Sequence, residues 1–283
     1  MMYYFLISLS AVFFSFIFIF NDKYREMYGS GADAALKFAA GSHFAGLVAL
    51  LIINRFRLEF TPFTLITATA AAADVVIFNI FSLKALEKTN LSKFSVFSMI
   101  GGMALPFAAG IIFFEEEITA GKIICLILVC AAVAFTIEKG DKKGSFVYYF
   151  GVFFTNGLYG VINKFYSFSD FRKASAAGFS VLIEGLIVVL ALILLIFTKD
   201  KIGLVKGKGL LYMGGYGVMT AVGNLLLLIA LSVLPASAQY PFVTGGVMII
   251  STVYSFFTPN KPGKKELAGV GLAIVGILAL VLI

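Results

Sequence analysis

Long apolar segments recur along this chain and restrict its fold more than any other feature. A run of about 18 or more apolar residues can cross the hydrocarbon core of a membrane as a helix. Strands are not expected, because the runs lack period-2 alternation and only a helix satisfies its own backbone in lipid. The sequence therefore predicts an all-α integral membrane protein with ten transmembrane helices. The predicted spans lie near residues 2–20, 33–53, 62–83, 91–114, 119–137, 145–163, 175–198, 209–233, 236–257 and 265–283.

Composition and charge support this class. With 60% hydrophobic and 13% charged residues, the chain has too little polar surface to cover a soluble globule of 283 residues. Met1 to Phe20 lacks a basic start and a small-residue cleavage site, so we expect it to remain as the first helix. The net charge of +7 comes from Lys and Arg beside apolar segments. Membrane lipid, rather than nucleic acid, is therefore the expected partner.

The two halves of the chain resemble each other. A shift of 145 residues places Asn79 on Asn224, and the pair Gly101-Gly102 falls on Gly245-Gly246 after a one-residue gap. These matches predict two five-helix units, residues 1–138 and 139–283, within one membrane domain. Because five is odd, the second unit enters the membrane from the opposite face, and the repeats are inverted around a central cavity. Inverted repeats place a binding site near the midplane and permit alternating access.

One local motif carries a family resemblance. The segment Phe113 to Thr119, with Glu116 at its centre, precedes the fifth apolar run. It is similar to the Gly-Glu-x-Leu-Thr pattern of EamA-type ten-helix members of the drug/metabolite transporter superfamily, with Glu115 in place of the glycine. The second half departs from the pattern, because Thr258 to Gly263 stands where another acidic turn is expected.

This resemblance implies a secondary transporter, either an exporter or an exchanger, of a small metabolite or drug-like molecule. It also implies a cavity lined by helices one to four and six to nine, with helices five and ten at the periphery. A multi-pass protein of a bacterial inner (plasma) membrane is expected. The loops after the odd-numbered segments hold most of the Lys and Arg residues, which places both termini outside by the positive-inside rule. The family implies the reverse, and the sequence leaves this open.

Ionisable side chains inside membrane segments mark candidate site residues, because each costs roughly 2.5 to 3.5 kcal/mol to insert. His43, Asp74 and Glu184 lie near the middle of their segments, and Lys37 lies near one end. Lys37 is four residues from Asp33, so it either forms a local ion pair or attracts an anionic substrate group. Asp74 needs a neutralising partner or a cationic substrate.

The alignment of the two halves brings Glu184 close to His43. An imidazole with a pKa of about 6.5 can exchange protons with a neighbouring carboxylate at physiological pH. The pair is therefore a candidate for coupling transport to a proton gradient. A histidine that only hydrogen-bonds between helices is the alternative.

Uncharged polar residues on repeat-related segments complete the candidate set; they either line the cavity or hydrogen-bond between helices. The candidate substrate-cavity residues are Lys37, His43, Asp74, Asn79, Ser95, Asn156, Glu184, Asn224, Tyr240 and Thr244. Two prolines near the glycine pairs should bend their helices, either as a gate or as a static kink. The candidate gating hinges are Gly101, Gly102, Pro106, Pro241, Gly245 and Gly246.

Other functional classes fit the sequence less well. We find no nucleophile with histidine, acidic metal cluster or paired aspartates, so an enzyme, a bound metal and a cofactor are not expected. Glu115 to Glu117 is expected to form a solvated turn. A channel, which needs a filter or a ring of like charges, is the first alternative, and a membrane-embedded enzyme the more distant one. Gly269, Ala273 and Gly276 indicate a packing face for a neighbouring helix or a second copy, so a homodimer through helices five and ten is open.

Overall fold

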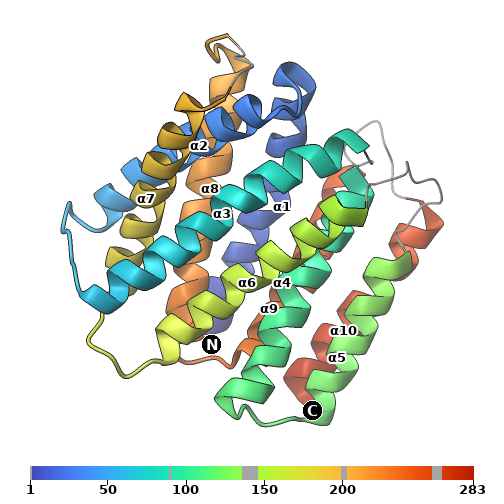
Figure 1. Ribbon diagram of the computed structural model, residues 1–283. Coiled ribbons are helices and arrows are strands. Elements are labelled where there is room, and N and C mark those ends of the chain that lie inside the picture. The colour runs from blue at the N-terminus through green and yellow to red at the C-terminus, as the bar shows by residue number, and fades with distance from the viewer. Residues whose placement is uncertain (1, 89–90, 136–145, 199–202, 257–262) are drawn as a thin grey trace.

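The computed structural model describes residues 2–88, 91–135, 146–198, 203–256 and 263–283, and these residues form ten helices (Figure 1). Each helix coincides with one predicted apolar segment, which confirms the all-α prediction. Three helices, α1, α3 and α6, continue five or more residues past their predicted ends, because polar and charged residues extend them beyond the apolar run. The helices are α1 (Met2–Tyr28), α2 (Ala32–Ile53), α3 (Pro62–Lys88), α4 (Leu91–Phe114), α5 (Ala120–Phe135), α6 (Phe146–Phe168), α7 (Ala176–Ile196), α8 (Lys208–Leu231), α9 (Ala236–Ser255) and α10 (Lys264–Leu282).

Local sequence sets where these helices begin. Pro62 is the first residue of α3, where its missing N–H would have no partner within the helix. The side chain of Ser175 caps α7 by accepting a hydrogen bond from the N–H of Gly178. Between α1 and α2, Gly29 adopts a positive φ of 80° that turns the chain back.

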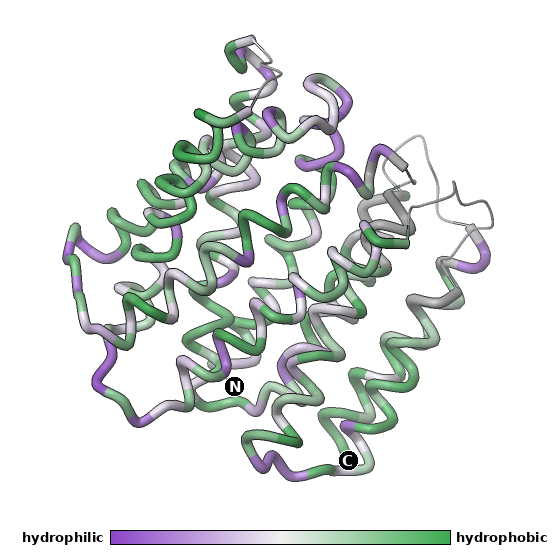
Figure 2. Tube along the Cα trace, viewed as in Figure 1, coloured by the Kyte–Doolittle hydropathy of each residue, from purple (hydrophilic) through white to green (hydrophobic). Residues whose placement is uncertain are grey.

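The surface of the bundle suits lipid. Six helices, α1 to α4, α7 and α8, contain stretches long and apolar enough to cross a membrane, and α5 and α10 contain shorter apolar stretches. Hydrophobic residues run along the helices, and hydrophilic ones gather at the turns (Figure 2). Large apolar side chains such as Ile66 and Leu211 are exposed on the outside. A surface of this kind identifies a multi-pass membrane protein.

The helices form a bundle with one pair set at its edge (Figure 1). In the bundle, α2 packs on α7 and α8, α1 on α8 and α9, and α6 on α3 and α4. The edge pair consists of α5 and α10, which pack mainly on each other. Ala273 is fully buried, and Gly276 lies against Cys125 and Leu128 of α5. The small-residue face of the last helix is therefore covered by a neighbouring helix of the same chain.

At the α2–α8 and α4–α6 crossings the helices are so close that only glycine fits. A Cβ on Gly217 of α8 would lie far less than 3.0 Å from the carbonyl oxygen of Ser42 in α2. A Cβ on Gly101 of α4 would meet the carbonyl oxygen of Phe153 in α6 in the same way. At both places one backbone rests directly on another.

The predicted hinge residues lie at similar contacts. Pro106 and Pro241 are inside α4 and α9, and a Cβ on Gly102 would meet the side chain of Asn156. Gly245 faces Ile277 of α10, and Gly246 faces Ala11 of α1. Close packing thus accounts for the glycine pairs, and their role as hinges stays a prediction.

The turn between α4 and α5 holds Glu115 at a φ of 52°, in the left-handed region that favours glycine. The family pattern has glycine at this position. Glu115→Gly is expected to stabilise the fold by up to about 1 kcal/mol, because the strain of a Cβ at positive φ disappears. Glu115→Val is expected to destabilise it by about 1 kcal/mol, because a branched side chain adds strain. Thermal unfolding in detergent measures both, and a lower melting temperature for the glycine variant would contradict the explanation.

Candidate binding cavity

A cavity of about 150 Å³ lies between the helices of the bundle. Residues of α1, α2, α3 and α4 line one part of its wall, and residues of α6, α7, α8 and α9 line the rest. Among the described residues, none of α5 or α10 reaches it. The cavity therefore draws on the same eight helices that the family resemblance implies.

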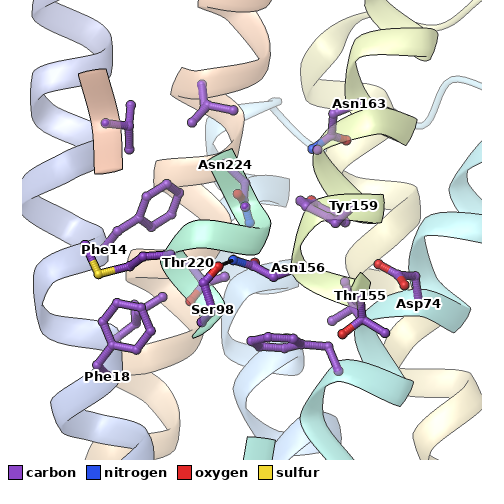
Figure 3. Close-up of a pocket in the computed structure, with 18 of the residues that line it drawn as sticks. Phe14, Phe18, Asp74, Ser98, Thr155, Asn156, Tyr159, Asn163, Thr220 and Asn224 are labelled. Carbon is purple, nitrogen blue, oxygen red and sulfur yellow. Dashed lines mark hydrogen bonds between the residues drawn. The ribbon is translucent and has the colours of Figure 1, made fainter. Parts of the chain in front are cut away.

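Most of the predicted site residues meet in this cavity. Its wall contains His43, Asp74, Asn156, Glu184, Asn224, Tyr240 and Thr244. Figure 3 shows Asp74 of α3 near Thr155 and Tyr159 of α6, and Asn224 of α8 on another side. Asn156 donates a hydrogen bond of 2.6 Å to the carbonyl oxygen of Ser98 in α4. The wall thus combines groups from both halves of the chain.

His43 and Glu184 form the predicted pair. Nδ1 of His43 lies 2.7 Å from Oε2 of Glu184, and the two side chains are 3% and 6% exposed. Gly46 of α2 makes room for this carboxylate, because a Cβ there would lie 2.9 Å from Oε2. The Nε2 atom of His43 has no hydrogen-bond partner among the described residues. The pair joins α2 of the first half to α7 of the second and leaves one imidazole nitrogen available.

Asp74 carries a second unused polar atom. Its side chain lines the cavity, the residue is 5% exposed, and Oδ2 has no hydrogen-bond partner within the described part of the chain. A buried acceptor without a partner costs about 1 to 3 kcal/mol, and more when it is charged. Such an atom is a natural contact for a ligand or a proton.

Three predicted residues are not part of the described wall. Lys37 is six residues before His43 and lies elsewhere around α2, where Nζ is 3.1 Å from Oδ2 of Asp33. The local ion pair, one of the two alternatives for Lys37, is thus present. Asn79 is five residues after Asp74, about 140° around the helix. Its side-chain amide donates a hydrogen bond to the carbonyl oxygen of Val75 in the same helix. The side chain of Ser95 is outside the described residues.

A buried ion pair outside the cavity wall was not predicted. Oε1 of Glu116 lies 2.7 Å from Nζ of Lys164, with the side chains only 7% and 6% exposed. Each carboxylate oxygen also accepts a 2.8 Å hydrogen bond from a backbone N–H at the start of α9, from Ala236 and Ser237. The expected solvated turn was therefore wrong for Glu116. Lys164, expected in a loop, lies in α6, because that helix runs on to Phe168.

Comparisons with known proteins agree with this picture. No family model matches the chain. The chain is 33% identical, over 75 residues, to the "probable 4-amino-4-deoxy-L-arabinose-phosphoundecaprenol flippase subunit ArnE" of Hamiltonella defensa. This match covers 26% of the chain and 68% of that subunit.

A solved crystal structure, described only as that of a protein, shares the fold. It has a TM-score of 0.74 and 10% sequence identity, and the match covers 98% of this chain and 94% of the other. The fold is therefore one already known from experiment. The sequence match to ArnE shows the family as well as the fold. The chain belongs to the drug/metabolite transporter family, of which that subunit is a member.

Proposed function

We propose that this protein is an EamA-type secondary transporter that carries a small metabolite or drug-like molecule across a membrane by alternating access. The observation that carries the proposal is the cavity, which eight helices line and in whose wall the His43–Glu184 contact joins one half of the chain to the other. A site near mid-depth between two halves suits rocking of one half against the other. The family relationship supports transport rather than an enzyme.

Helix packing supports two inverted repeats, residues 1–138 and 139–283. The contacts come in matched sets: α1 packs on α8 as α6 packs on α3, and α4 packs on α6 as α9 packs on α1. The pairs α2 with α7, α4 with α9 and α5 with α10 each map onto themselves. A pseudo-twofold axis that exchanges the halves would produce this pattern. Five helices in each half would then make the repeats inverted.

The His43–Glu184 pair is our candidate for energy coupling. An imidazole beside a carboxylate can bind and release a proton near neutral pH, and both groups face the cavity. A substrate that enters the cavity changes the surroundings of the pair. Proton release and substrate binding would thus be linked.

Proteoliposomes provide the test. Compounds are screened for saturable uptake that is accelerated by the same compound on the other side, with internal pH followed by a dye. We expect counterflow and substrate-driven proton movement in the wild type. His43→Gln and Glu184→Gln should reduce proton movement at least tenfold, and the control Asn79→Ala, outside the cavity wall, should not. Non-saturating uptake without counterflow would instead identify a channel, and unchanged proton movement in both variants would exclude the coupling pair.

Lipid flipping is a second candidate, favoured by the ArnE match. The name of that subunit describes movement of an amino sugar carried on a lipid phosphate. The match covers only a quarter of this chain, so the solute proposal stands first. Flipping of a fluorescent lipid-linked sugar in the same liposomes would favour the second candidate.

A further inference from the structure

The charges in the cavity wall are unequal. Its ionisable groups, apart from tyrosines, are Asp74, Glu184 and His43. Among the described wall residues there is no lysine or arginine. Glu184 is already in contact with His43, while Oδ2 of Asp74 has no hydrogen-bond partner within the described chain. Even when His43 is protonated, the wall has one more carboxylate than cations.

The lysines of neighbouring elements do not remove this excess. Lys37 of α2 is 3.1 Å from Asp33, and Lys164 of α6 is 2.7 Å from Glu116. Neither lysine lines the cavity. An anionic ligand would therefore lie near two carboxylates. The basic side chain of the described wall, His43, is already in contact with Glu184. A cationic ligand would meet an unused carboxylate oxygen.

Aromatic rings supply the rest of a cation site. Phe14 and Phe18 of α1 line the cavity, as do Phe78 of α3 and Tyr159 of α6. Figure 3 shows Phe14 and Phe18 on the α1 side and Asp74 on the α3 side, with Tyr159 between them in the view. Ring faces attract cations, and the attraction is stronger in a site without water. The same rings pack well against an apolar body.

We propose that the cavity binds an organic monocation, with its ammonium group at Asp74 and its apolar or aromatic body against the rings of α1, α3 and α6. One positive charge matches the one carboxylate of the described wall, Asp74, that is not in contact with a basic side chain of the described residues. This inference deepens the proposed function, because it names the substrate class of the same cavity. It concerns binding, so it can be tested without transport.

Three probes with one ring and different charges give the test. Isothermal titration calorimetry on the purified, detergent-solubilised protein compares phenethylammonium, the neutral 2-phenylethanol and the anionic 3-phenylpropionate. We expect phenethylammonium to bind at least tenfold more tightly than 2-phenylethanol, and 3-phenylpropionate not to bind measurably. In Asp74→Asn the preference for the cation should fall to about twofold or less. Asp33→Asn removes a buried carboxylate outside the cavity wall and should keep the full preference.

Thermal unfolding of each variant shows that it is folded before titration. The wild-type comparison decides the question by itself if Asp74→Asn does not fold. Equal or tighter binding of the alcohol or the anion, no binding of phenethylammonium to the folded wild type, or an unchanged preference in Asp74→Asn would each overturn the inference. Saturable counterflow of some other solute without any cation preference would overturn it and leave the transporter proposal standing. Cation preference with non-saturating flux would support this inference and overturn the transporter proposal.

Discussion

Gly217→Ala is expected to destabilise this protein by about 3 kcal/mol or more, the upper end of the usual cost of overpacking. The added Cβ would overlap the backbone carbonyl of Ser42, and neither α8 nor α2 can move a backbone atom without shifting the whole crossing. The crossing lies one residue from His43, so the cavity wall would be displaced as well. Thermal unfolding and gel filtration in detergent measure the loss of folded protein.

Gly214→Ala is the matched control in the same helix. A Cβ on Gly214 would have no neighbour within 4 Å, and alanine favours a helix over glycine by up to about 1 kcal/mol. This variant should be as stable as the wild type or slightly more so. Equal melting temperatures for the two variants would show that the α2–α8 crossing can relax, contrary to our description of its packing.

Glu116→Gln is expected to cost about 3 to 5 kcal/mol, the usual effect of removing one partner from a buried ion pair. The change leaves the Lys164 ammonium buried beside a neutral amide and weakens the hydrogen bonds to the start of α9. Lys164→Met in the same protein should recover part of the loss, because it removes the uncompensated charge. Thermal unfolding of the single and double variants measures this coupling.

The same carboxylate should make stability depend on pH. Burial alone would raise the pKa of Glu116, but the hydrogen bonds from Lys164, Ser237 and Ala236 outweigh it and hold the pKa below its usual value. The stabilisation is therefore fully present above the unfolded-state pKa of about 4.3 and is lost as pH falls through the lower folded-state pKa. The gap in melting temperature between wild type and Glu116→Gln should narrow in that range. Glu117→Gln, at an exposed neighbour, should show no gap at any pH.

The sequence predicted the helices and much of the cavity for clear physical reasons. Apolar runs long enough for a membrane fix where helices lie, and the alignment of the two halves predicted that His43 and Glu184 lie close together, as they do. Buried ionisable groups such as Asp74 were also good markers, because lipid tolerates them only beside a cavity or partner.

The errors arose where hydropathy gives no signal. Lys164 looked like a loop residue because a charge interrupts the apolar run, yet α6 continues through it, and its partner Glu116 lies in the turn between α4 and α5. Glu116 looked solvated because its neighbours are acidic, and its contacts with α9 join residues 120 positions apart. Asn79 matches Asn224 in the repeat, but only Asn224 lines the cavity. Spacing alone does not show which residues distant in sequence make contact, or which face of a helix meets the cavity.

The edge pair of α5 and α10 provides attachment sites for dyes in single-molecule experiments. No described residue of these helices lines the cavity, and Ile127 of α5 and Val275 of α10 are exposed. A dye attached at either position would report on movement of the bundle without touching a bound solute. Cys125 is buried beside Gly276 at the α5–α10 contact, whereas Cys130 is partly exposed, so Cys130 would be replaced before a thiol label is directed to an introduced surface cysteine.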